Sequence, residues 1–210
     1  MRIVEFANEE FYHIYNRGTD KRFTFLTDID RKRFIRSLDS FNRTKRSSQS
    51  LSKNLRNRKS TPEPIVEIHG FCLMGNHYHL LLRQLVDGGV SKFMHSLSMG
   101  YTKYFNKKYN RSGNLFESAY KIKHVDTTGY LLQVSAYIHC NPFELTTKNH
   151  RTFMERYRWS SFGQYLHGSG YPFVATDFIL GHFVDEQDYK TFVFEKLDAH
   201  LFTDIDYVTR

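Results

Sequence analysis

The order of strand-like and helix-like segments predicts an α+β fold, in which helices lie on a ferredoxin-like antiparallel sheet and a small helical C-terminal extension follows. Four segments rich in aromatic and β-branched residues alternate with two segments of helical periodicity in the order β-α-β-β-α-β. This pattern ends near Pro142, and short, polar, helix-like stretches follow it. We therefore divide the chain into a domain at 1–145 and a C-terminal extension at 146–210.

The first half of the domain contains a strand, a helix and a basic insertion. The strand is expected at 11–15, which stops at the turn signal Asn16-Arg17-Gly18, and 23–26 is a candidate for a short second strand. The capping sequence at 27–30 starts a helix that runs to about residue 42. The insertion at about 42–62 is basic and serine-rich without a single acid, which predicts a loop that is either simply solvated or contacts phosphates.

The second half of the domain adds a hairpin, two helices and a last strand. Its expected elements are, in order, a strand at 65–73, a strand at 77–83, a helix from about 92 to 108, a strand at 119–125 and a helix from about 126 to 141. Met74-Gly75-Asn76 forms the tight link of the hairpin, and Ser91 can cap the first of these helices. Pro142 ends the second, because proline has no amide hydrogen and disfavours helical geometry just before it.

Composition favours a nucleic-acid partner. The 210 residues include 30 Lys plus Arg against 22 Asp plus Glu, a formal charge of +8, together with 19 Phe, 14 Tyr and 1 Trp. Phosphates attract the cations and bases stack on the rings, although aromatic residues are also ordinary core material. Cys72 and Cys140 are too few and too far apart for a disulfide scaffold. No apolar run resembles a signal peptide or a membrane helix, so we expect a soluble, cytoplasmic protein without a membrane partner.

Two histidines stand two residues apart at the start of the expected strand at 77–83. Successive side chains of a strand point to opposite faces, so His77 and His79 share one face and can grip one divalent metal ion. The alternative is that they are two polar residues at a strand end. His69, on the neighbouring strand, is expected to be hydrogen-bonded in the sheet rather than to approach the metal.

The helix that follows carries a second group of polar residues. Tyr130, Val134, Tyr137 and Asn141 fall on one helical face at spacings of four, three and four residues. An apolar stripe does not normally close with a hydroxyl and an amide one turn apart, although an asparagine before proline can simply end a helix. A tyrosine beside a metal site is a plausible nucleophile toward phosphorus, provided that the metal offsets the charge of the phosphate.

At these residues the chain resembles the HUH single-tyrosine transposases, and most closely their branch of REP-associated tyrosine transposases, which carry the IS200-like transposase domain. The matching motifs are Phe-Tyr-His-Ile-Tyr-Asn-Arg-Gly at 11–18, Leu-Met-Gly-Asn-His-Tyr-His at 73–79, Gly-Asn-Leu-Phe at 113–116 and Tyr-Ile-His-Cys-Asn-Pro at 137–142. The His-x-His motif alone is weak, but joined to Tyr-x-x-x-Asn-Pro at this distance and in this order it is specific.

The resemblance implies an enzyme that nicks single-stranded DNA and transfers strands through a 5′-phosphotyrosine intermediate. It implies that Tyr137 is the nucleophile and that His77, His79 and Asn141 bind a divalent metal, Mg²⁺ or Mn²⁺. Two imidazoles favour Mn²⁺, because Mg²⁺ prefers shells made of oxygen alone. The implied partner is single-stranded or hairpin DNA, and whether the chain acts as a monomer or a homodimer stays open.

Two positions depart from the family's pattern. Gly75 stands where relatives usually have proline, and Glu117-Ser118-Ala119 stands where they tend to have a basic residue, which removes an expected phosphate contact. This loss slightly favours an alternative function, a domesticated protein of the same fold that binds a DNA hairpin or repeat without cutting it. A structural zinc site using Cys72 or Cys140 is a weaker alternative, which the ligand spacing does not support.

Five cations are candidates for contacts with DNA phosphates, with a solvated surface as the alternative for each. They are Arg17, Lys121, Lys123, Arg156 and Arg158. His139 and Cys140 point away from the face of Tyr137 and Asn141 by helical spacing, so we leave them out of the site.

Overall fold

The computed structural model describes residues 5–43 and 63–199. Its sheet contains four strands, which are β1 (Phe11–Arg17), β2 (Val66–Leu73), β3 (His77–Gln84) and β4 (Lys121–Val125). They pair antiparallel in the order β2-β3-β1-β4, so β1 and β3 are central. This arrangement confirms the predicted antiparallel, ferredoxin-like sheet. The insertion predicted at about 42–62 lies, from residue 44 onward, outside the described residues.

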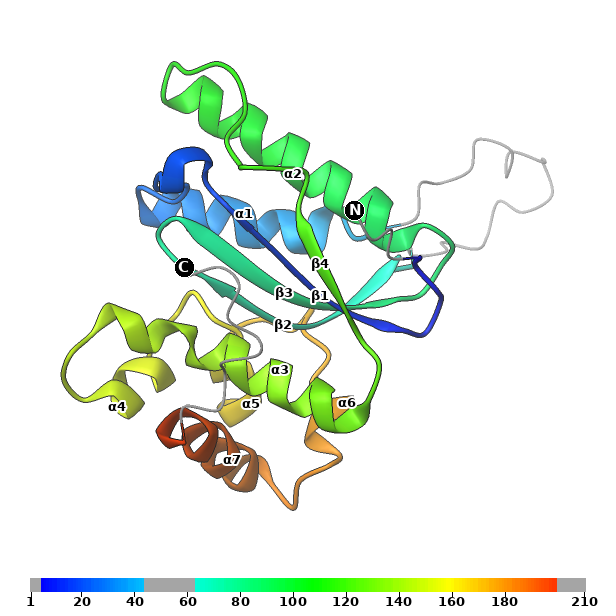
Figure 1. The fold of residues 1–210 in the computed structure, drawn as a ribbon, viewed down its shortest axis with the longest axis vertical. Coiled ribbons are helices and arrows are strands. Elements are labelled where there is room, and N and C mark those ends of the chain that lie inside the picture. The colour runs from blue at the N-terminus through cyan, green and yellow to red at the C-terminus, as the bar shows by residue number, and fades with distance from the viewer. Residues whose placement is uncertain (1–4, 44–62, 200–210) are drawn as a thin grey trace, which may run out of the picture.

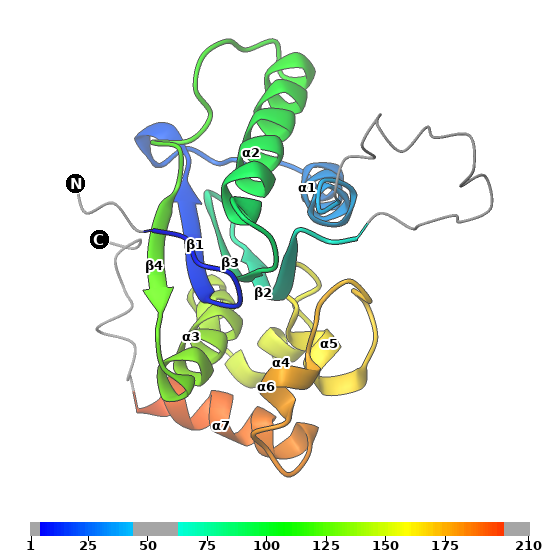
Figure 2. The ribbon, with the colours of Figure 1, turned by 90° about the vertical axis from the view of Figure 1, so that its right-hand side faces the viewer.

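Helices cover both faces of this sheet (Figures 1 and 2). One face is covered by α1 (Asp28–Ser40) and α2 (Gly89–Lys108), and the other by α3 (Thr128–Cys140) and the short helices that follow it. The short helices are α4 (His150–Glu155), α5 (Phe162–His167) and α6 (Asp177–Leu180), and the longer α7 (Glu186–Asp198) packs against α3. In the described part of the chain, the short 3-10 helices η1 (Thr19–Lys21) and η3 (Asn141–Leu145) follow β1 and α3.

The central strands divide their side chains between the two layers of helices. On the side of α1 and α2, Tyr12 and Ile14 of β1 and Tyr78 of β3 are fully buried. The ring of Tyr78 lies 5.0 Å from that of Phe34 on α1, which identifies the face. Because strand side chains alternate, residues 13 and 15 of β1 and 77 and 79 of β3 face α3.

The segment at 23–26 does not form the short strand that its apolar residues predicted. Instead, the amides of Thr24 and Phe25 both donate to the carbonyl oxygen of Gly75, at 3.0 and 3.1 Å. Phe25 enters the core at 2% exposure, whereas Phe23 is 64% exposed. The segment is therefore an irregular strap over the link between β2 and β3.

The start of α2 also differs from the prediction, because Gly88 rather than Ser91 precedes the first helical residue. Gly88 has a φ of 67°, a left-handed conformation that glycine adopts without steric cost. One turn further back, the side-chain oxygen of Gln84 accepts a hydrogen bond from the amide of Val90 at 3.2 Å. This bond satisfies an amide at the helix start that a capping side chain would otherwise bind.

The helical C-terminal extension is confirmed, but α7 does not simply face water as its many acids suggested. Tyr189, Val193 and Phe194 are buried on its inner side, and α7 packs against α3. His139 of α3 links the two, since its Nδ1 lies 2.7 Å from the hydroxyl of Tyr189 and its Nε2 lies 2.8 Å from Ser161 Oγ. The division of the chain at residue 145 stays a prediction.

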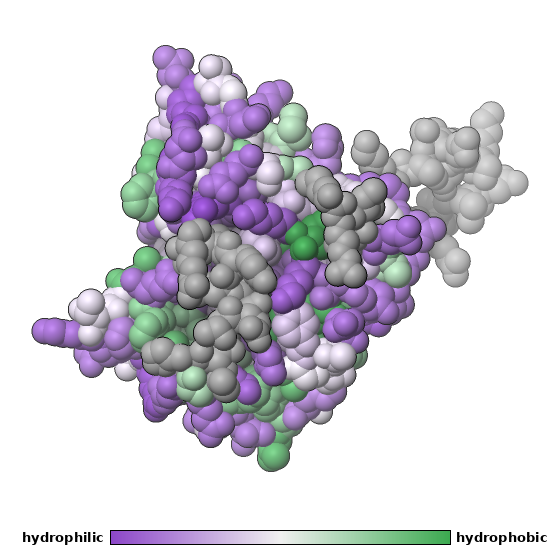
Figure 3. All heavy atoms as spheres, in the orientation of Figure 1, coloured by the Kyte–Doolittle hydropathy of each residue, from purple (hydrophilic) through white to green (hydrophobic). Residues whose placement is uncertain are grey.

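The surface in Figure 3 is mainly hydrophilic, and its hydrophobic residues gather in small, separate areas. Among the described residues, no helix combines the length and apolar character that crossing a membrane requires.

Candidate functional site

Two histidines of β3 lie at the centre of the candidate site. The register pairs His79 with Tyr15 and His77 with Arg17, and both histidines point toward α3. Their ring centroids are 5.2 Å apart, with planes at 88°. His77 is 5% exposed and His79 fully buried, so neither is a solvated residue at a strand end.

Tyr137 approaches these histidines from α3. Thr127 caps that helix by accepting the amide of Tyr130 at 3.2 Å. From the third turn of α3, Tyr137 places its ring 5.3 Å from that of His79 at an interplanar angle of 88°. The structure thus brings together a tyrosine and two histidines that are some sixty positions apart in the sequence.

Asn141 follows Tyr137 by one helical turn, at the C-cap of α3. Its amide nitrogen donates to the carbonyl oxygen of Tyr137 at 2.8 Å, and the residue is 8% exposed. This bond fixes the orientation of the side chain and leaves its oxygen as the atom suited to a metal.

A third histidine, which the motif comparison left out of the site, lies in the same cluster. His13 of β1 is 1% exposed, and its Nε2 lies 2.9 Å from Nδ1 of His79. Its ring centroid is 5.8 Å from that of Tyr137. Alternation along β1 places residue 13 on one face with 15 and 17, but only the pairing of β1 with β3 shows that this face is that of His77 and His79.

Burial favours the neutral form of the imidazoles of His13 and His79. Burial, with a smaller effect of Lys123, lowers the pKa of His13 to about 3. Burial and the neighbouring His13 and His77 lower the pKa of His79 well below its ordinary value. A neutral imidazole keeps a lone pair on one nitrogen, which is the form that binds metals.

The donor set fits a divalent ion. Nε2 of His79 is buried and has no hydrogen-bond partner among the described residues, as expected of a nitrogen whose partner is a ligand. Within the described part of the chain, no three His, Cys, Asp or Glu side chains converge on a metal site. Asn141, one turn beyond Tyr137 at the C-cap of α3, offers an amide oxygen as a candidate donor of another type. Two imidazoles and an amide suit Mn²⁺ better than Mg²⁺.

Three of the five predicted phosphate-binding cations lie on the sheet face of the histidines. Lys121 and Lys123 of β4 pair with Tyr15 and His13 of β1, and the ammonium of Lys123 lies 4.9 Å from the ring of Tyr130. Arg17 pairs with Glu117, with 3.1 Å between Nε and Oε1. Glu117, in the 117–119 segment where the resemblance led us to expect a basic residue, therefore offsets a cation on the face of the histidines.

The other two cations lie apart from this face. Arg158 stacks on Trp159 at 4.7 Å and lies 3.9 Å from Asp28, beyond the β2 edge of the sheet. Arg156 is exposed at the end of α4.

The remaining histidine and the cysteines have other partners. His69 Nε2 lies 3.3 Å from Glu67 Oε2 within the sheet. Cys72 and Cys140 are buried free thiols, and burial raises the pKa of both. With no group of three ligands of the His, Cys and acidic types in the described residues, the structural zinc alternative has no support.

Gly75, the other departure from the family's pattern, lies against the ring of Phe23. A Cβ at position 75 would come within 2.6 and 2.7 Å of two of its ring atoms. The neighbouring Asn76 binds Nδ1 of His77 through its side-chain oxygen at 2.7 Å. The glycine thus lets an exposed aromatic ring lie over the link that leads into the site.

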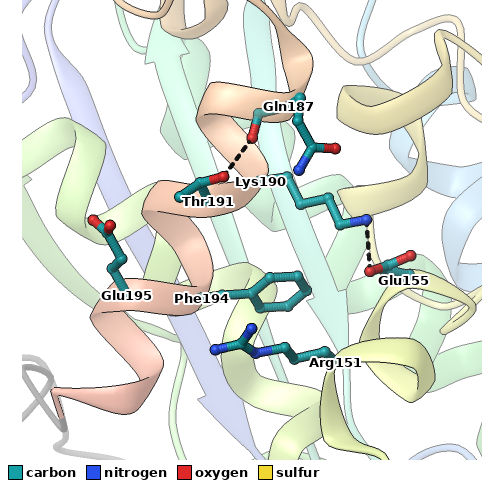
Figure 4. A pocket seen from close by; sticks show the side chains of 7 residues that line it. All are labelled: Arg151, Glu155, Gln187, Lys190, Thr191, Phe194 and Glu195. Carbon is teal, nitrogen blue, oxygen red and sulfur yellow. Dashed lines mark hydrogen bonds and ion pairs between the residues drawn. The ribbon is translucent and has the colours of Figure 1, made fainter.

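A cavity of about 440 Å³ lies between α4 and α7 (Figure 4), and it contains none of the predicted site residues. Two pairs of its lining residues bind each other: Lys190 pairs with Glu155 at 2.8 Å, and the hydroxyl of Thr191 donates to the carbonyl of Gln187. We assign it no ligand.

Comparisons with known proteins find a family model and solved structures that are similar to this chain. The family model described as "Transposase IS200 like" matches residues 43–141. None of the curated proteins matches the chain. Seven chains of solved structures match it. One of them, a REP-associated tyrosine transposase bound to a REP hairpin, superposes with a TM-score of 0.53 at 14% identity, over 84% of this chain and 90% of that one. At this identity the likeness shows the fold.

The matched residues include β2, β3, α2, β4 and α3, and hence both histidines of β3, Tyr137 and Asn141. The family indicates a DNA-processing enzyme of the transposase type. The resemblance seen in the sequence motifs is confirmed, because residues 43–141 match the family model of IS200-like transposases.

Proposed function

We propose that the chain is a metal-dependent tyrosine transposase, which nicks single-stranded DNA at Tyr137 and transfers strands through a 5′-phosphotyrosine. The observation that carries this proposal is the packing of Tyr137 against His79 with Asn141 one turn further along α3. Tyr137 and the candidate ligand His79 are in contact within one chain, which supports a site completed by a single subunit.

His77, His79 and Asn141 would hold the divalent ion, Mg²⁺ or Mn²⁺, through two imidazole nitrogens and an amide oxygen. When bound, the ion supplies positive charge that offsets the negative charge of the phosphate. The packing of the Tyr137 ring against His79 limits the positions that its hydroxyl can take.

In the chemical step, the Tyr137 oxygen forms a bond to phosphorus and the bond from phosphorus to the 3′-oxygen breaks. The phenol loses its proton and the leaving 3′-oxygen gains one, so a 3′-hydroxyl results. The phosphodiester is conserved as a phosphotyrosine ester. A second 3′-hydroxyl can therefore attack that ester and reseal the strand without a nucleotide cofactor.

Single-stranded or hairpin DNA is the proposed partner. The formal charge of +8 supports a polyanion, and Lys121 and Lys123 place cations on the face of the histidines. The solved transposase with the same fold is bound to a hairpin. Tyr137 is 5% exposed, so side chains around it must move when a phosphate reaches its hydroxyl.

The test is a covalent adduct. The protein is incubated with an oligonucleotide that joins a hairpin to a single strand, labelled at its 3′ end, because the downstream fragment is the one that stays on the tyrosine. We expect a denaturant-resistant protein-DNA band with Mn²⁺ or Mg²⁺ and none with EDTA. Tyr137→Phe should abolish it, whereas Tyr130→Phe on the same helix should not. A band that persists in Tyr137→Phe would refute the assignment of the nucleophile.

A second candidate function is a domesticated protein that binds a DNA hairpin or repeat without cutting it. Its support is Glu117, which offsets Arg17 beside the histidines and weakens a phosphate contact. This candidate predicts hairpin binding with no adduct in either metal, on oligonucleotides from any repeat that flanks the gene.

A further inference from the structure

His13 lies at the centre of β1 in a position where an apolar side chain would be expected. It is 1% exposed, and its Nε2 is joined to Nδ1 of His79 by a hydrogen bond of 2.9 Å. The two rings are nearly parallel, at 21°, with centroids 5.2 Å apart. The bond connects the two central strands of the sheet on the face of Tyr137.

Such a bond between neutral imidazoles fixes which nitrogens carry protons. Each ring has one N–H and one nitrogen with a free lone pair. If His79 is to bind a metal through Nε2, its proton must be on Nδ1, and Nδ1 then needs an acceptor. The reverse direction, with His13 donating, would leave the proton of His79 on Nε2 and block ligation there.

His13 is not itself a ligand by this geometry. Its Nε2 is engaged with His79, and among the described residues no three side chains of the His, Cys, Asp and Glu types converge on one point. The remaining ring nitrogen, Nδ1, is buried and has no hydrogen-bond partner among the described residues.

We propose that His13 is a positioning residue, which accepts the Nδ1 hydrogen of His79 and so keeps His79 Nε2 unprotonated and aimed at the ion. The inference rests on the proposed function, because it assumes that His79 is a ligand. It assigns a role to a residue of the first strand, outside the residues that the family model matches.

The arrangement leaves one buried N–H, that of His13 Nδ1, unpaired within the described structure. Replacing His13 with leucine would remove this unpaired N–H group but would leave the N–H at Nδ1 of His79 without its acceptor. The number of unpaired groups is unchanged, so the metal-free protein should keep nearly its native melting temperature. Metal affinity, in contrast, should fall in His13→Leu, because Nδ1 of the proposed ligand His79 has lost its hydrogen-bond acceptor.

The experiment measures Mn²⁺ affinity by isothermal titration calorimetry, without DNA, on the full chain. We expect His13→Leu to weaken binding roughly 10- to 100-fold. His13→Gln should bind nearly as the native protein, because the glutamine oxygen can reach the place of Nε2 and accept the same hydrogen. Tyr137→Phe should bind normally, and His79→Ala should bind least.

A native affinity in His13→Leu would overturn the inference while leaving the proposed function intact. An equal loss in the leucine and glutamine variants would also overturn it, since packing rather than the acceptor would then matter. Unchanged binding in His79→Ala would refute the proposed metal site, and the inference with it. Imidazole ¹⁵N spectra of the metal-free native protein show directly which ring nitrogen of His79 carries the proton, without any variant. A proton on Nε2 contradicts the inference, and a proton on Nδ1 supports it.

Discussion

Replacing Glu117 with glutamine tests whether DNA phosphates bind beside His77. Glu117 pairs with Arg17 at 3.1 Å, with side chains 28% and 13% exposed, and the register places Arg17 opposite His77. The carboxylate offsets this cation and would itself repel an approaching phosphate. We therefore expect Glu117→Gln to bind single-stranded DNA more tightly than the native protein.

The size of the effect follows from counterion release. The logarithm of affinity for single strands falls with the logarithm of salt concentration by about 0.7 for each phosphate that the protein neutralises. One additional contact by Arg17 should therefore steepen the slope by about 0.7 and raise affinity roughly fivefold at ~0.1 M salt. Fluorescence anisotropy with a labelled hairpin and its single-stranded flank, measured over a range of salt concentrations, gives both numbers.

Glu155→Gln is the matched control. Glu155 forms an ion pair of the same kind, at 2.8 Å to Lys190, and its side chain is 27% exposed (Figure 4). The substitution changes the net charge of the chain equally, but between α4 and α7. If both variants tighten binding to the same extent, overall charge rather than the Arg17 contact is responsible. An unchanged salt slope in Glu117→Gln would refute the contact directly.

Two further predictions concern stability. Burial alone would raise the pKa of Asp30, but hydrogen bonds from Lys108, Tyr109 and neighbouring groups lower it from 3.8 to about 2. Because the folded state depresses this pKa, the stabilisation of about 2 kcal/mol is complete above about pH 4 and is lost as the pH falls toward 2. In urea unfolding, Asp30→Asn should lose this stabilisation at pH 7, and its free energy of unfolding should fall less steeply than that of the native protein between about pH 4 and 2. An unchanged slope in that range would contradict this account. Gly75→Ala should cost on the order of 1 kcal/mol in the native background and nearly nothing in Phe23→Ala, because the added Cβ meets only that ring; equal costs in both backgrounds would show that the ring is not the obstacle.

Most of the fold could be predicted from the sequence because its elements carry strong local signals. The alternating strands and the period of α1 and α3 are set by which residues the sheet and helices bury. The differences arise where distant groups supply the hydrogen bonds. The carbonyl oxygen of Gly75 accepts hydrogen bonds from two amides of the strap at 23–26, and the side-chain oxygen of Gln84 accepts one from the amide of Val90 at the start of α2. No local pattern contains either partner.

In the candidate site, too, the sequence predicts relations within one element, but not those between elements. The spacing of His77 with His79, and of Tyr137 with Asn141, assigns each pair to one face of its own element. Which faces meet depends on tertiary packing, and so does every contact between strands. The partner of Arg17 is 100 positions away in the sequence, and the bond from His13 to His79 needs the register of β1 against β3. The motif comparison quoted the segment around His13, but nothing in its spacing gave this histidine a role.

The two faces of the central strands differ in what they contribute. Toward α1 and α2, residues such as Tyr78 and Leu80 bury apolar surface, which stabilises the fold. Toward α3, the same strands bury His13, His77 and His79, which lose hydration, and His13 Nδ1 and His79 Nε2 have no hydrogen-bond partner among the described residues. Desolvation of this kind opposes folding unless a ligand or a hydrogen bond offsets it. Burial of apolar surface toward α1 and α2 can offset this desolvation of the imidazoles. We infer that the imidazoles on the face toward α3 are kept for metal binding, because they do not add to stability.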